Sequence, residues 1–374
     1  MVSVKCIQNY SFFVAGHQYV MCESNEDQLR NQAPTAFGMS TKVSCSYVGQ
    51  NLDDKSILIC RTSGIGDILI MLNAIQELKK KYPTCKISVA SGQTDILKGE
   101  ADKLYFMPFD AEIIKQHDYF LHFQGILESN DFPSMTTHAS DLFLQRLFLD
   151  SDKKIATLKS SKLELNWLEA TLEEMKLKNE DISNDSDFVI GVQMMPSNIV
   201  RGYPTERMKR VINKLASENV VICLIGENNI ANFTLADYYK GNKENIKICT
   251  GFNLRQTIVF SQRYDLIISP DSMMIQLAGC YKIPCVGIYG PFPSDLRMRY
   301  HYNSIGIDAC VVCSPCFSYD EKCLKGNGWS PCFNSIKPTH ILSAADKLYY
   351  SITNKHFNYM KDIKTPEVVN VICD

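Results

Sequence analysis

The sequence predicts an α/β protein with two parallel β-sheets covered by helices, preceded by a small β segment. Two observations carry this prediction. Short apolar stretches alternate with helical stretches from residue 56 to 149 and again from 188 to 290. A polar stretch with few apolar residues, 179–187, separates the two series. Strands that alternate with helices are typical of parallel sheets, which bind ligands at the carboxyl ends of their strands.

The first series, residues 51–180, is interpreted as one domain. Its strands are predicted at 56–60, 86–91, 104–109 and 119–123. Its helices are predicted at 68–82, 139–149 and 163–175. The first of these helices ends in Lys79, Lys80 and Lys81 before Pro83, as suits a helix C-terminus.

The second series, residues 181–340, is interpreted as the other domain. Its strands are predicted at 188–193, 220–226, 245–250, 265–271 and 284–290, and its helices at 205–217, 253–264 and 272–281. An amphipathic helix is predicted at 338–352. Residues 341–374, which include most of this helix, are interpreted as the C-terminal helix and tail.

Residues 1–50 differ from the rest of the chain. Short alternating apolar runs around Gly16 predict a small N-terminal β appendage. The polar stretch at 24–35, SNEDQLRNQAPT, is predicted to be a loop.

Composition limits the function classes. A chain of 374 residues is long enough for two domains. With 21% charged residues and a net charge of −2, it has no general basic surface for nucleic acid or membrane lipid. No apolar run reaches the ~18 residues of a membrane span, and the N-terminus lacks a signal-peptide pattern. We expect a cytoplasmic protein whose 15 cysteines are free thiols.

The most informative stretch is 57–67, ILICRTSGIGD, an apolar strand that runs into a turn of small residues. The turn contains Thr62, Ser63, Gly64 and Gly66. A helix that starts near Asp67 would offer N–H groups to an anion, but the Asp67 carboxylate would repel one. Two interpretations therefore stay open. Asp67 is either a base that points into a cleft or the N-cap of the helix.

Five segments in order resemble glycosyltransferase family 9, the ADP-heptose:lipopolysaccharide heptosyltransferases, which have the GT-B fold. They are 57–83, 117–125, 191–215, 223–229 and 269–291. They look like the family's R-x-x-x-x-G-D turn, its D-x-x-hydrophobic-D-x-Q-G strand, the loop opening its second domain, its Gly-Gly-x-x-Glu turn and its N-D-[ST]-G block. The resemblance covers about residues 55–345. It implies two Rossmann-like domains that face each other across a cleft, the first for the acceptor and the second for the nucleotide sugar.

The resemblance also implies the chemistry, an inverting transfer from a nucleotide-diphosphate sugar that needs no metal. Asp67 falls on the family's proposed base, and the small-residue turn before it lies on the acceptor side. The implied donor-binding residues are Arg201, Glu227, Asp271, Ser272 and Gln276. A base must remove the acceptor proton while positive charge and N–H groups stabilise the leaving diphosphate. A solvated Arg201 and a surface-turn Glu227 stay open as alternatives.

The chain departs from the family pattern in the donor block. Met273 stands where the family has Gly, and Gln276 stands where it has His. The final F-G-x-T is YGPF at 289–292. The donor pocket is therefore altered, and neither the nucleotide nor the sugar (hexose, heptose or pentose) is predicted.

A cysteine cluster lies near the end of the second series. It has the spacing C-x2-C-x2-C-x6-C-x8-C and consists of Cys310, Cys313, Cys316, Cys323 and Cys332. Three interpretations stay open: a structural Zn²⁺ site with one cysteine to spare, a disulfide or redox pair, or a loop with free thiols. No other metal and no further cofactor are expected. His122, in an apolar strand, is predicted to be a core residue.

The prediction is a glycosyltransferase acting on a carbohydrate or lipopolysaccharide-like hydroxyl. Because 1–50 faintly resembles β modules of bacteriophage proteins, an alternative acceptor is a hydroxymethylated DNA base. A local basic groove would then involve Arg201, Arg207, Lys209 and Arg210. Alternatives of other classes are a non-catalytic nucleotide-sugar binding protein, which has no use for Asp67, and an epimerase or lyase. The oligomeric state is not predicted.

Overall fold

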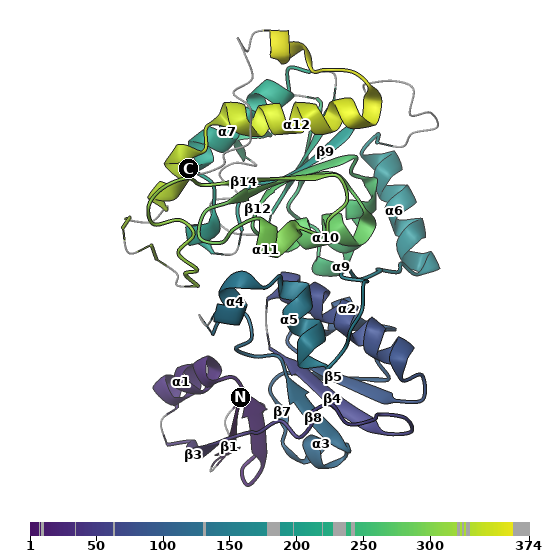
Figure 1. Cartoon of the computed structure of the whole chain (residues 1–374), viewed down its shortest axis with the longest axis vertical. Helices are drawn as coiled ribbons and strands as arrows, with labels where there is room; N and C mark the ends of the chain where they lie inside the picture. Colours follow the sequence, from purple (N-terminus) through teal and green to yellow (C-terminus); the bar gives the residue numbers. More distant parts are fainter. Residues whose placement is uncertain are drawn as a thin grey trace. The chain divides into compact units, whose positions relative to one another are not determined.

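The structure is a computed structural model (Figure 1). It describes residues 1–6, 8, 11–33, 35–62, 64–129, 132–177, 188–196, 198–218, 220–226, 237–240, 244–319, 322–323, 325–326 and 330–361. The chain divides into two compact units, Met1–Ala156 and Thr157–Asp374. The predicted boundary at 179–187 lies outside the described residues, and the helix α6 (Lys162–Glu174) before it is in the second unit.

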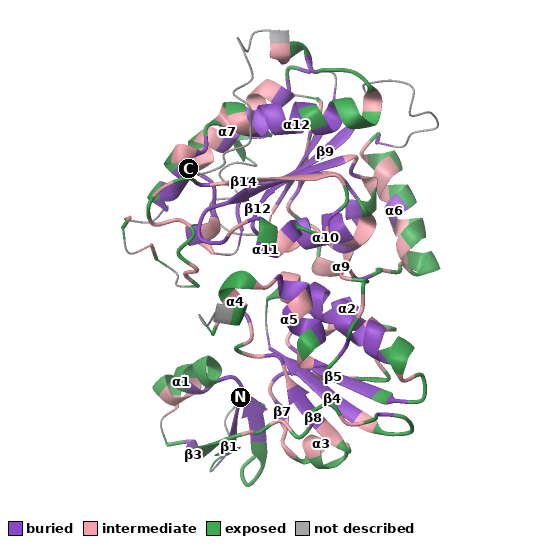
Figure 2. Ribbon diagram, viewed as in Figure 1, coloured by how far each residue is buried: buried purple, intermediate pink, exposed green. Residues whose placement is uncertain are grey.

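The first unit is built on a four-stranded parallel sheet in the order β6-β5-β4-β8. Its strands are β4 (Ser56–Arg61), β5 (Lys86–Ser91), β6 (Lys103–Phe106) and β8 (Tyr119–His122). The helices are α2 (Ile65–Lys81), α3 (Glu112–Lys115), α4 (Phe132–Thr136) and α5 (Ala139–Arg146), with a 3₁₀ turn at Thr94–Leu97. Helices α2 and α5 pack on each other, and β4 and β5 are almost wholly buried (Figure 2).

The N-terminal residues form a second, antiparallel sheet in the order β3-β1-β2-β7. Its strands are β1 (Val2–Cys6), β2 (Gln18–Met21), β3 (Phe37–Lys42) and β7 (Phe109–Asp110). Because Val20 pairs with Phe109, the appendage is joined by backbone pairing to the rest of the unit. Met1 and Cys22 also pack in one core cluster with Leu58 and other residues of the parallel sheet.

The prediction of a loop at 24–35 is wrong, because most of it forms helix α1 (Glu23–Gln32). Glu26 and Arg30 form an i, i+4 ion pair of 2.6 Å, which supports a helix with little apolar character. Arg30 also donates to the carbonyl oxygen of Gly38 at 2.5 Å, and this bond ties α1 to β3. The helix is therefore held by polar contacts that its hydrophobic pattern does not reveal.

The second unit is built on a six-stranded parallel sheet in the order β11-β10-β9-β12-β13-β14. Its strands are β9 (Val189–Gln193), β10 (Val221–Ile225), β11 (Ile246–Cys249), β12 (Leu266–Pro270), β13 (Cys285–Tyr289) and β14 (Ser304–Asp308). The strand order reverses between β9 and β12, which lie side by side. Such a switch point is where open α/β sheets bind their ligands.

Helices cover both faces of this sheet (Figure 1). Helices α7 (Thr205–Leu215) and α12 (Pro338–Thr353) pack on one face, and α9 (Leu254–Phe260), α10 (Met273–Tyr281) and α11 (Asp295–Met298) lie on the other. Short 3₁₀ turns occur at Ile199–Arg201, Ser261–Arg263, Pro331–Ser335 and Asn358–Lys361. Helix α12 contributes Ile341, Ala345 and Leu348 to the core of this unit. In the part of the chain that the structure describes, no helix is long and apolar enough to cross a membrane.

Candidate active site

Asp67 lies at the start of α2 in the first unit. The N-cap of this helix is Gly64, and Asp67 is its third residue, so the interpretation of Asp67 as the N-cap is wrong. Its carboxylate oxygen Oδ2 accepts a hydrogen bond of 2.5 Å from Nη2 of Arg61. The Asp67 side chain remains 29% exposed. A carboxylate that is fixed on one oxygen and open to solvent can receive a proton from a bound hydroxyl.

Arg61, at the end of β4, organises the surroundings of Asp67, and sequence reasoning assigned it no role. Its side chain is buried, and Nη2 also donates to Oε1 of Glu128 at 2.6 Å. Nη1 donates to the carbonyl oxygen of Phe123 at 2.8 Å. Burial lowers the pKa of Arg61, but the two carboxylates raise it by more, so the guanidinium stays charged. The available signal was an arginine directly after the apolar run at 57–60.

The turn before α2 fits closely around Asp67. Gly64 has φ +86°, a conformation that residues with a side chain rarely adopt, and a Cβ atom there would overlap Oδ2 of Asp67. Thr62 is buried, and its hydroxyl donates to Oε1 of Gln124 at 2.6 Å. Gly66 lies in the first turn of α2, and Ser63 lies outside the described residues. The turn and the loop after β8 are therefore fastened to each other.

In the second unit, a polar network joins the carboxyl ends of β9 and β12. Oε1 of Gln193 accepts hydrogen bonds from Ser269, at 3.1 Å, and from the hydroxyl of Ser272. Ser272 is the N-cap of α10, and its Oγ accepts from the Met274 N–H at 3.1 Å. The start of α10 is thus anchored at the switch point of the sheet. Gln193 and Ser269 were not predicted, because their roles depend on two strands meeting.

Two of the predicted donor-binding residues lie close to each other in this unit. Nη1 of Arg201 is 3.8 Å from Oδ2 of Asp271. Asp271 is buried, whereas the Arg201 side chain is 30% exposed. Gln276 is buried in α10, and its amide nitrogen donates to the carbonyl oxygen of Arg297 at 3.2 Å, which links α10 to α11. Glu227 lies outside the described residues.

The cysteine cluster follows β14 and folds back to the end of β13. The N–H groups of Cys316 and Phe317 donate to the carbonyl oxygen of Pro291, and the Ser314 hydroxyl donates to that of Gly290. All five cysteines are free thiols. Burial raises the pKa of Cys332 to about 11, and the nearby thiols of the cluster add to this shift. Among the described residues, no three His, Cys, Asp or Glu side chains lie close enough to hold a metal ion.

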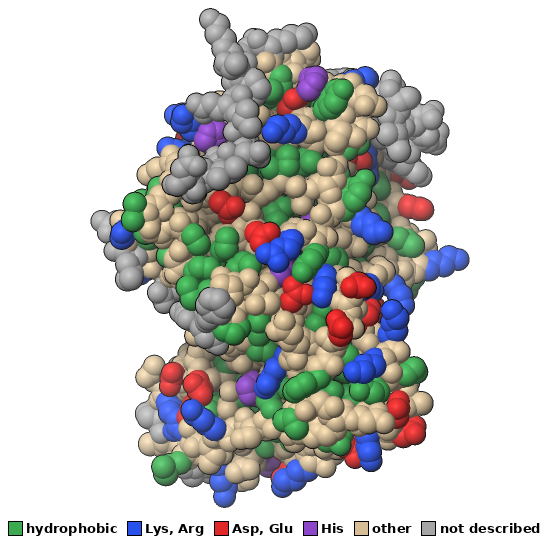
Figure 3. Space-filling model, in the orientation of Figure 1, with side chains coloured by type: hydrophobic (Ala, Val, Ile, Leu, Met, Phe, Trp, Pro, Cys, Tyr) green, Lys and Arg blue, Asp and Glu red, His purple; other side chains and the backbone are tan. Residues whose placement is uncertain are grey.

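Two cations of the predicted basic groove are engaged within the second unit. Nη1 of Arg207 donates to three carbonyl oxygens of the 333–336 segment, and Nζ of Lys209 lies 2.7 Å from Oε1 of Glu206. On the face shown in Figure 3, Lys and Arg side chains are interspersed with Asp and Glu. Neither observation favours a surface that binds the phosphate backbone of DNA.

Comparison with known proteins relates part of this chain to a family model. The model of glycosyltransferase family 9 (heptosyltransferase) matches residues 147–326. Residues 147–326 are therefore similar to a family 9 glycosyltransferase domain. The match spans just under half of the chain and includes Arg201 and Asp271 but not Asp67. The match confirms the predicted resemblance to glycosyltransferase family 9 and the predicted enzyme class, a glycosyltransferase.

Solved structures confirm the predicted GT-B fold. The family 9 glycosyl transferase from Veillonella parvula is 14% identical with a TM-score of 0.62, over 81% of this chain and 99% of that one. E. coli ADP-heptose lps heptosyltransferase II is 15% identical with a TM-score of 0.61, over 79% and 99%. The dodecameric iron-containing heptosyltransferase TibC of enterotoxigenic E. coli, in complex with ADP-D-β-D-heptose, is 14% identical with a TM-score of 0.58, over 94% and 91%. No curated protein sequence matches the chain.

Proposed function

We propose that the protein transfers a sugar, with inversion, from a nucleoside-diphosphate sugar to an acceptor hydroxyl, and that Asp67 is the base. One observation carries this proposal. In a family 9 glycosyltransferase, a part-exposed carboxylate is fixed at the start of a helix by a buried arginine. A carboxylate that served only to neutralise Arg61 would not need a second one, Glu128, on the same nitrogen.

On the acceptor side, the two oxygen atoms of the Asp67 carboxylate have different roles. Oδ2 is held by Arg61, which leaves Oδ1 to take the proton of the acceptor hydroxyl. The acceptor oxygen forms its bond to the anomeric carbon of the sugar while the bond from that carbon to the diphosphate breaks. The diphosphate leaves with the electron pair. Glu128 shares the Arg61 guanidinium, so the positive charge is divided between two carboxylates.

On the donor side, the proposed partners of the diphosphate are Arg201 and the first N–H groups of α10. The helix N-terminus carries positive partial charge, and a guanidinium binds phosphate oxygens in a bidentate manner. Asp271 lies beside Arg201 and keeps the guanidinium at the switch point. TibC was solved with ADP-D-β-D-heptose, which makes this the first donor to test. Met273 and Gln276 stand where the family has Gly and His. We therefore propose only the class of donor, a nucleoside-diphosphate sugar, and not a particular nucleotide or sugar.

The acceptor is proposed to be a carbohydrate hydroxyl. One structural relative is described as an ADP-heptose lps heptosyltransferase. No comparison supports a modified-DNA acceptor, and Arg207 and Lys209 are already engaged with carbonyl oxygens and with Glu206.

A donor panel tests the function. Purified full-length protein is titrated calorimetrically with ADP, UDP, GDP and CMP, and the release of the nucleotide from the matching sugar donors is followed. We expect one nucleoside diphosphate to bind and its sugar donor to be turned over when a saccharide acceptor is present. Arg201→Gln should weaken donor binding, whereas Arg210→Gln, on the exposed side of α7, should not. Binding without turnover would support a non-catalytic sugar-nucleotide protein, and turnover without acceptor would support an epimerase or lyase.

We further propose that the cysteine cluster holds a structural iron or zinc ion. Thiolates suit either metal, and the relative that covers 94% of this chain is described as iron-containing. Three thiols lie near Cys332, although the described arrangement does not close a ligand set. The ion would fasten the loop to the end of β13 and take no part in the transfer.

Elemental analysis of the purified full-length protein tests the metal proposal. Stoichiometric iron or zinc is expected, and Cys332→Ser should lose it. Cys85→Ser, a buried cysteine of the first unit, is the control and should keep the metal. Protein that is purified without metal and does not take up added iron or zinc would overturn the proposal.

A further inference from the structure

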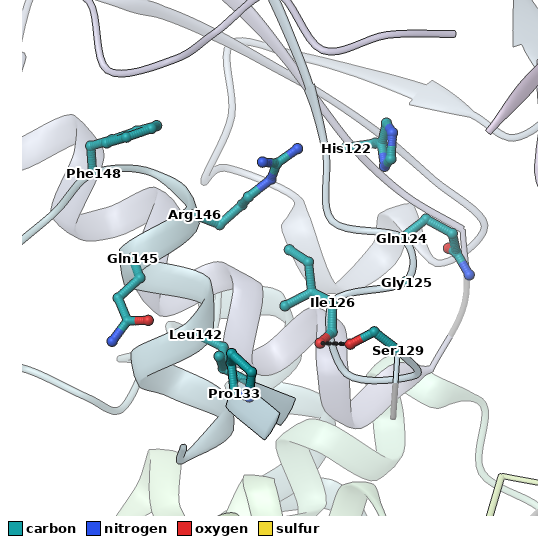
Figure 4. A pocket seen from close by; sticks show the side chains of 10 residues that line it. All are labelled: His122, Gln124, Gly125, Ile126, Ser129, Pro133, Leu142, Gln145, Arg146 and Phe148. Carbon is teal, nitrogen blue, oxygen red and sulfur yellow. Dashed lines mark hydrogen bonds between the residues drawn. The ribbon is translucent and has the colours of Figure 1, made fainter. Parts of the chain in front are cut away.

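The first unit contains a pocket of about 450 Å³ at the carboxyl end of β8 (Figure 4). The prediction of His122 as a core residue is wrong, because its side chain is only partly buried and lines this pocket. Gln124, also in the lining, accepts a hydrogen bond from Thr62 in the turn before α2. The pocket therefore belongs to the surroundings of the proposed base.

A separate network of contacts lies in the second unit, between α10 and the cysteine loop. We define the cysteine loop as residues 309–319, which carry three cysteines of the cluster. The loop lies at the surface, where the Val312 and Cys316 side chains are exposed. Phe317 has φ +54°, which is rare for a bulky residue and persists only where the surroundings hold it. The contacts that hold the end of the loop are therefore of interest.

The end of the loop packs on Phe292, a residue after β13 that is 2% exposed. The ring centres of Phe317 and Tyr319 lie 6.0 Å and 4.7 Å from that of Phe292. The guanidinium of Arg297 lies over the same ring, 4.8 Å from its centre, as in a cation–π contact. Its Nη2 also donates to the Tyr319 hydroxyl at 2.9 Å. The Arg297 side chain thus contacts the loop directly, and also through Phe292.

The backbone of the same arginine holds α10. The carbonyl oxygen of Arg297 accepts the hydrogen bond from Gln276 of α10. Helix α11, which carries Arg297, is itself fixed at its start. The N–H and the hydroxyl of Ser294 donate to the Asp308 carboxylate at 2.7 Å and 2.6 Å. Arg297 therefore has the cysteine loop on its side chain and the helix of the proposed donor site on its backbone.

Helix α10 is also closely fitted to the segment that follows α11. His301 is buried, and a Cβ atom on Gly279 of α10 would lie 2.6 Å from its ring. Such close packing leaves α10 little room to shift on its own. At its start, α10 carries Ser272, whose hydroxyl joins the polar network at the switch point. A displacement of α11 would therefore reach the N–H groups that are proposed to bind the diphosphate.

We propose that Arg297 is a positioning residue, which couples the docking of the cysteine loop on Phe292 to nucleotide binding at α10. This inference rests on the proposed function and adds a regulatory element to its donor site. When the loop is docked, Tyr319 and Phe292 fix Arg297, and Arg297 fixes α10 in the position that suits the diphosphate. A change in how the loop is held then changes the nucleotide affinity. Because such a coupling is reciprocal, bound nucleotide also holds the loop more tightly in place.

Calorimetric titration of full-length variants with ADP, UDP and GDP tests the coupling. Arg297→Gln keeps the backbone bond to Gln276 but removes the guanidinium that contacts the loop. Tyr319→Ala removes the loop's side of the same contact. We expect each variant to bind the nucleotide that the wild type binds roughly tenfold more weakly, as is usual for coupled sites. The double variant should bind no more weakly than the single ones, because both changes break one contact.

Arg299→Gln is the matched control. It removes an exposed arginine two positions further along, whose side chain pairs with Asp295. This variant should bind nucleotide like the wild type. Wild-type affinity in Arg297→Gln or in Tyr319→Ala would overturn the proposal. Additive losses in the double variant would also overturn it, since Arg297 would then act independently of the loop.

Hydrogen exchange measured by mass spectrometry gives a readout in the loop itself. In the wild type, saturating nucleotide should slow exchange in residues 309–319, where the N–H groups of Cys316 and Phe317 donate to Pro291. Arg297→Gln should abolish this protection, because the loop and α10 are then uncoupled. Protection that persists in Arg297→Gln would contradict the proposal.

The coupling can fail separately from the proposed function. If the wild type binds and turns over a donor while Arg297→Gln keeps its nucleotide affinity, only the coupling fails. If no nucleotide binds the wild type, the proposed function fails, and the coupling is measured in the nucleotide-free protein. Tyr319→Ala should then raise the exchange rate at the start of α10, where the Met274 N–H donates to Ser272. An unchanged rate there would overturn the coupling as well.

Discussion

Replacing Gly64 by alanine tests how closely the turn before α2 is fitted to Asp67. The substitution has two separable effects. An L-residue at φ +86° costs about 1–2 kcal/mol relative to glycine. The new Cβ would also overlap Oδ2 of Asp67, the oxygen that Arg61 holds. Either the carboxylate or the turn must move, and overpacking of this kind costs about 1–3 kcal/mol more.

Gly99 provides a matched control in the same unit. Its φ is +79°, but nothing lies within 4 Å of a Cβ atom built there. Gly99→Ala therefore has only the conformational cost, about 1–2 kcal/mol. Gly64→Ala has the same cost and also displaces the proposed base. A displacement of about 1 Å at a reacting group can lower the rate roughly 10²-fold.

The assay combines urea unfolding with the initial rate of nucleotide release from the sugar donor in the presence of acceptor. Gly64→Ala should lose about two orders of magnitude in rate with unchanged donor affinity. Gly99→Ala should lose only the free energy of unfolding that its positive φ costs, and its rate of nucleotide release should equal that of the wild type. The reasoning is refuted if Gly64→Ala keeps the wild-type rate, or if Gly99→Ala loses activity to the same extent.

Three further predictions address the interactions around the two sites. Arg61→Gln should lower the free energy of unfolding by about 3 kcal/mol, since it leaves two carboxylates without their partner, and an unchanged urea midpoint would contradict this. Ser272→Ala should cost about 1 kcal/mol by removing the N-cap of α10 and should weaken nucleotide binding in calorimetry; full affinity would remove this hydroxyl from the donor site. Burial lowers the pKa of His301 to about 4, below its ordinary value of 6.5, so the unfolded chain binds more protons between these values. Stability is then lost as pH falls, by about 2 kcal/mol from pH 7 to pH 5, and His301→Phe should show a shallower pH dependence of the urea midpoint than the wild type.

The positions of most strands and helices could be predicted, because they depend on local periodicity. The strand at 56–60 and the helix after it occur as β4 and α2, within a few residues of the predicted bounds. The polar helix α1 was missed, because few of its residues are apolar and because Arg30 bonds it to a strand that follows it in the sequence. The β3-β1-β2-β7 sheet also depends on a pairing between residues about 90 positions apart, which no local pattern shows.

The candidate site could be predicted only where one residue type at one position implied the chemistry. Asp67 was singled out because its charge did not suit a phosphate loop. Glu128, the second carboxylate that pairs with Arg61, lies 67 residues away from it in the sequence, and only the fold brings the two together. Gln193 and Ser269 meet for the same reason, across two strands that are neighbours at the switch point. His122 was misread, because an apolar strand does not show that a pocket opens at its end.

The central claim is that Asp67 removes the acceptor proton, and Asp67→Asn tests it most directly. Asparagine keeps the shape of the side chain, and Glu128 continues to pair with Arg61, so the fold should persist. The measurement is the rate of sugar transfer at saturating donor, alongside the donor affinity in calorimetry. The account predicts a rate lower by roughly 10²–10⁴-fold with donor affinity retained. Transfer at the wild-type rate by Asp67→Asn would contradict it.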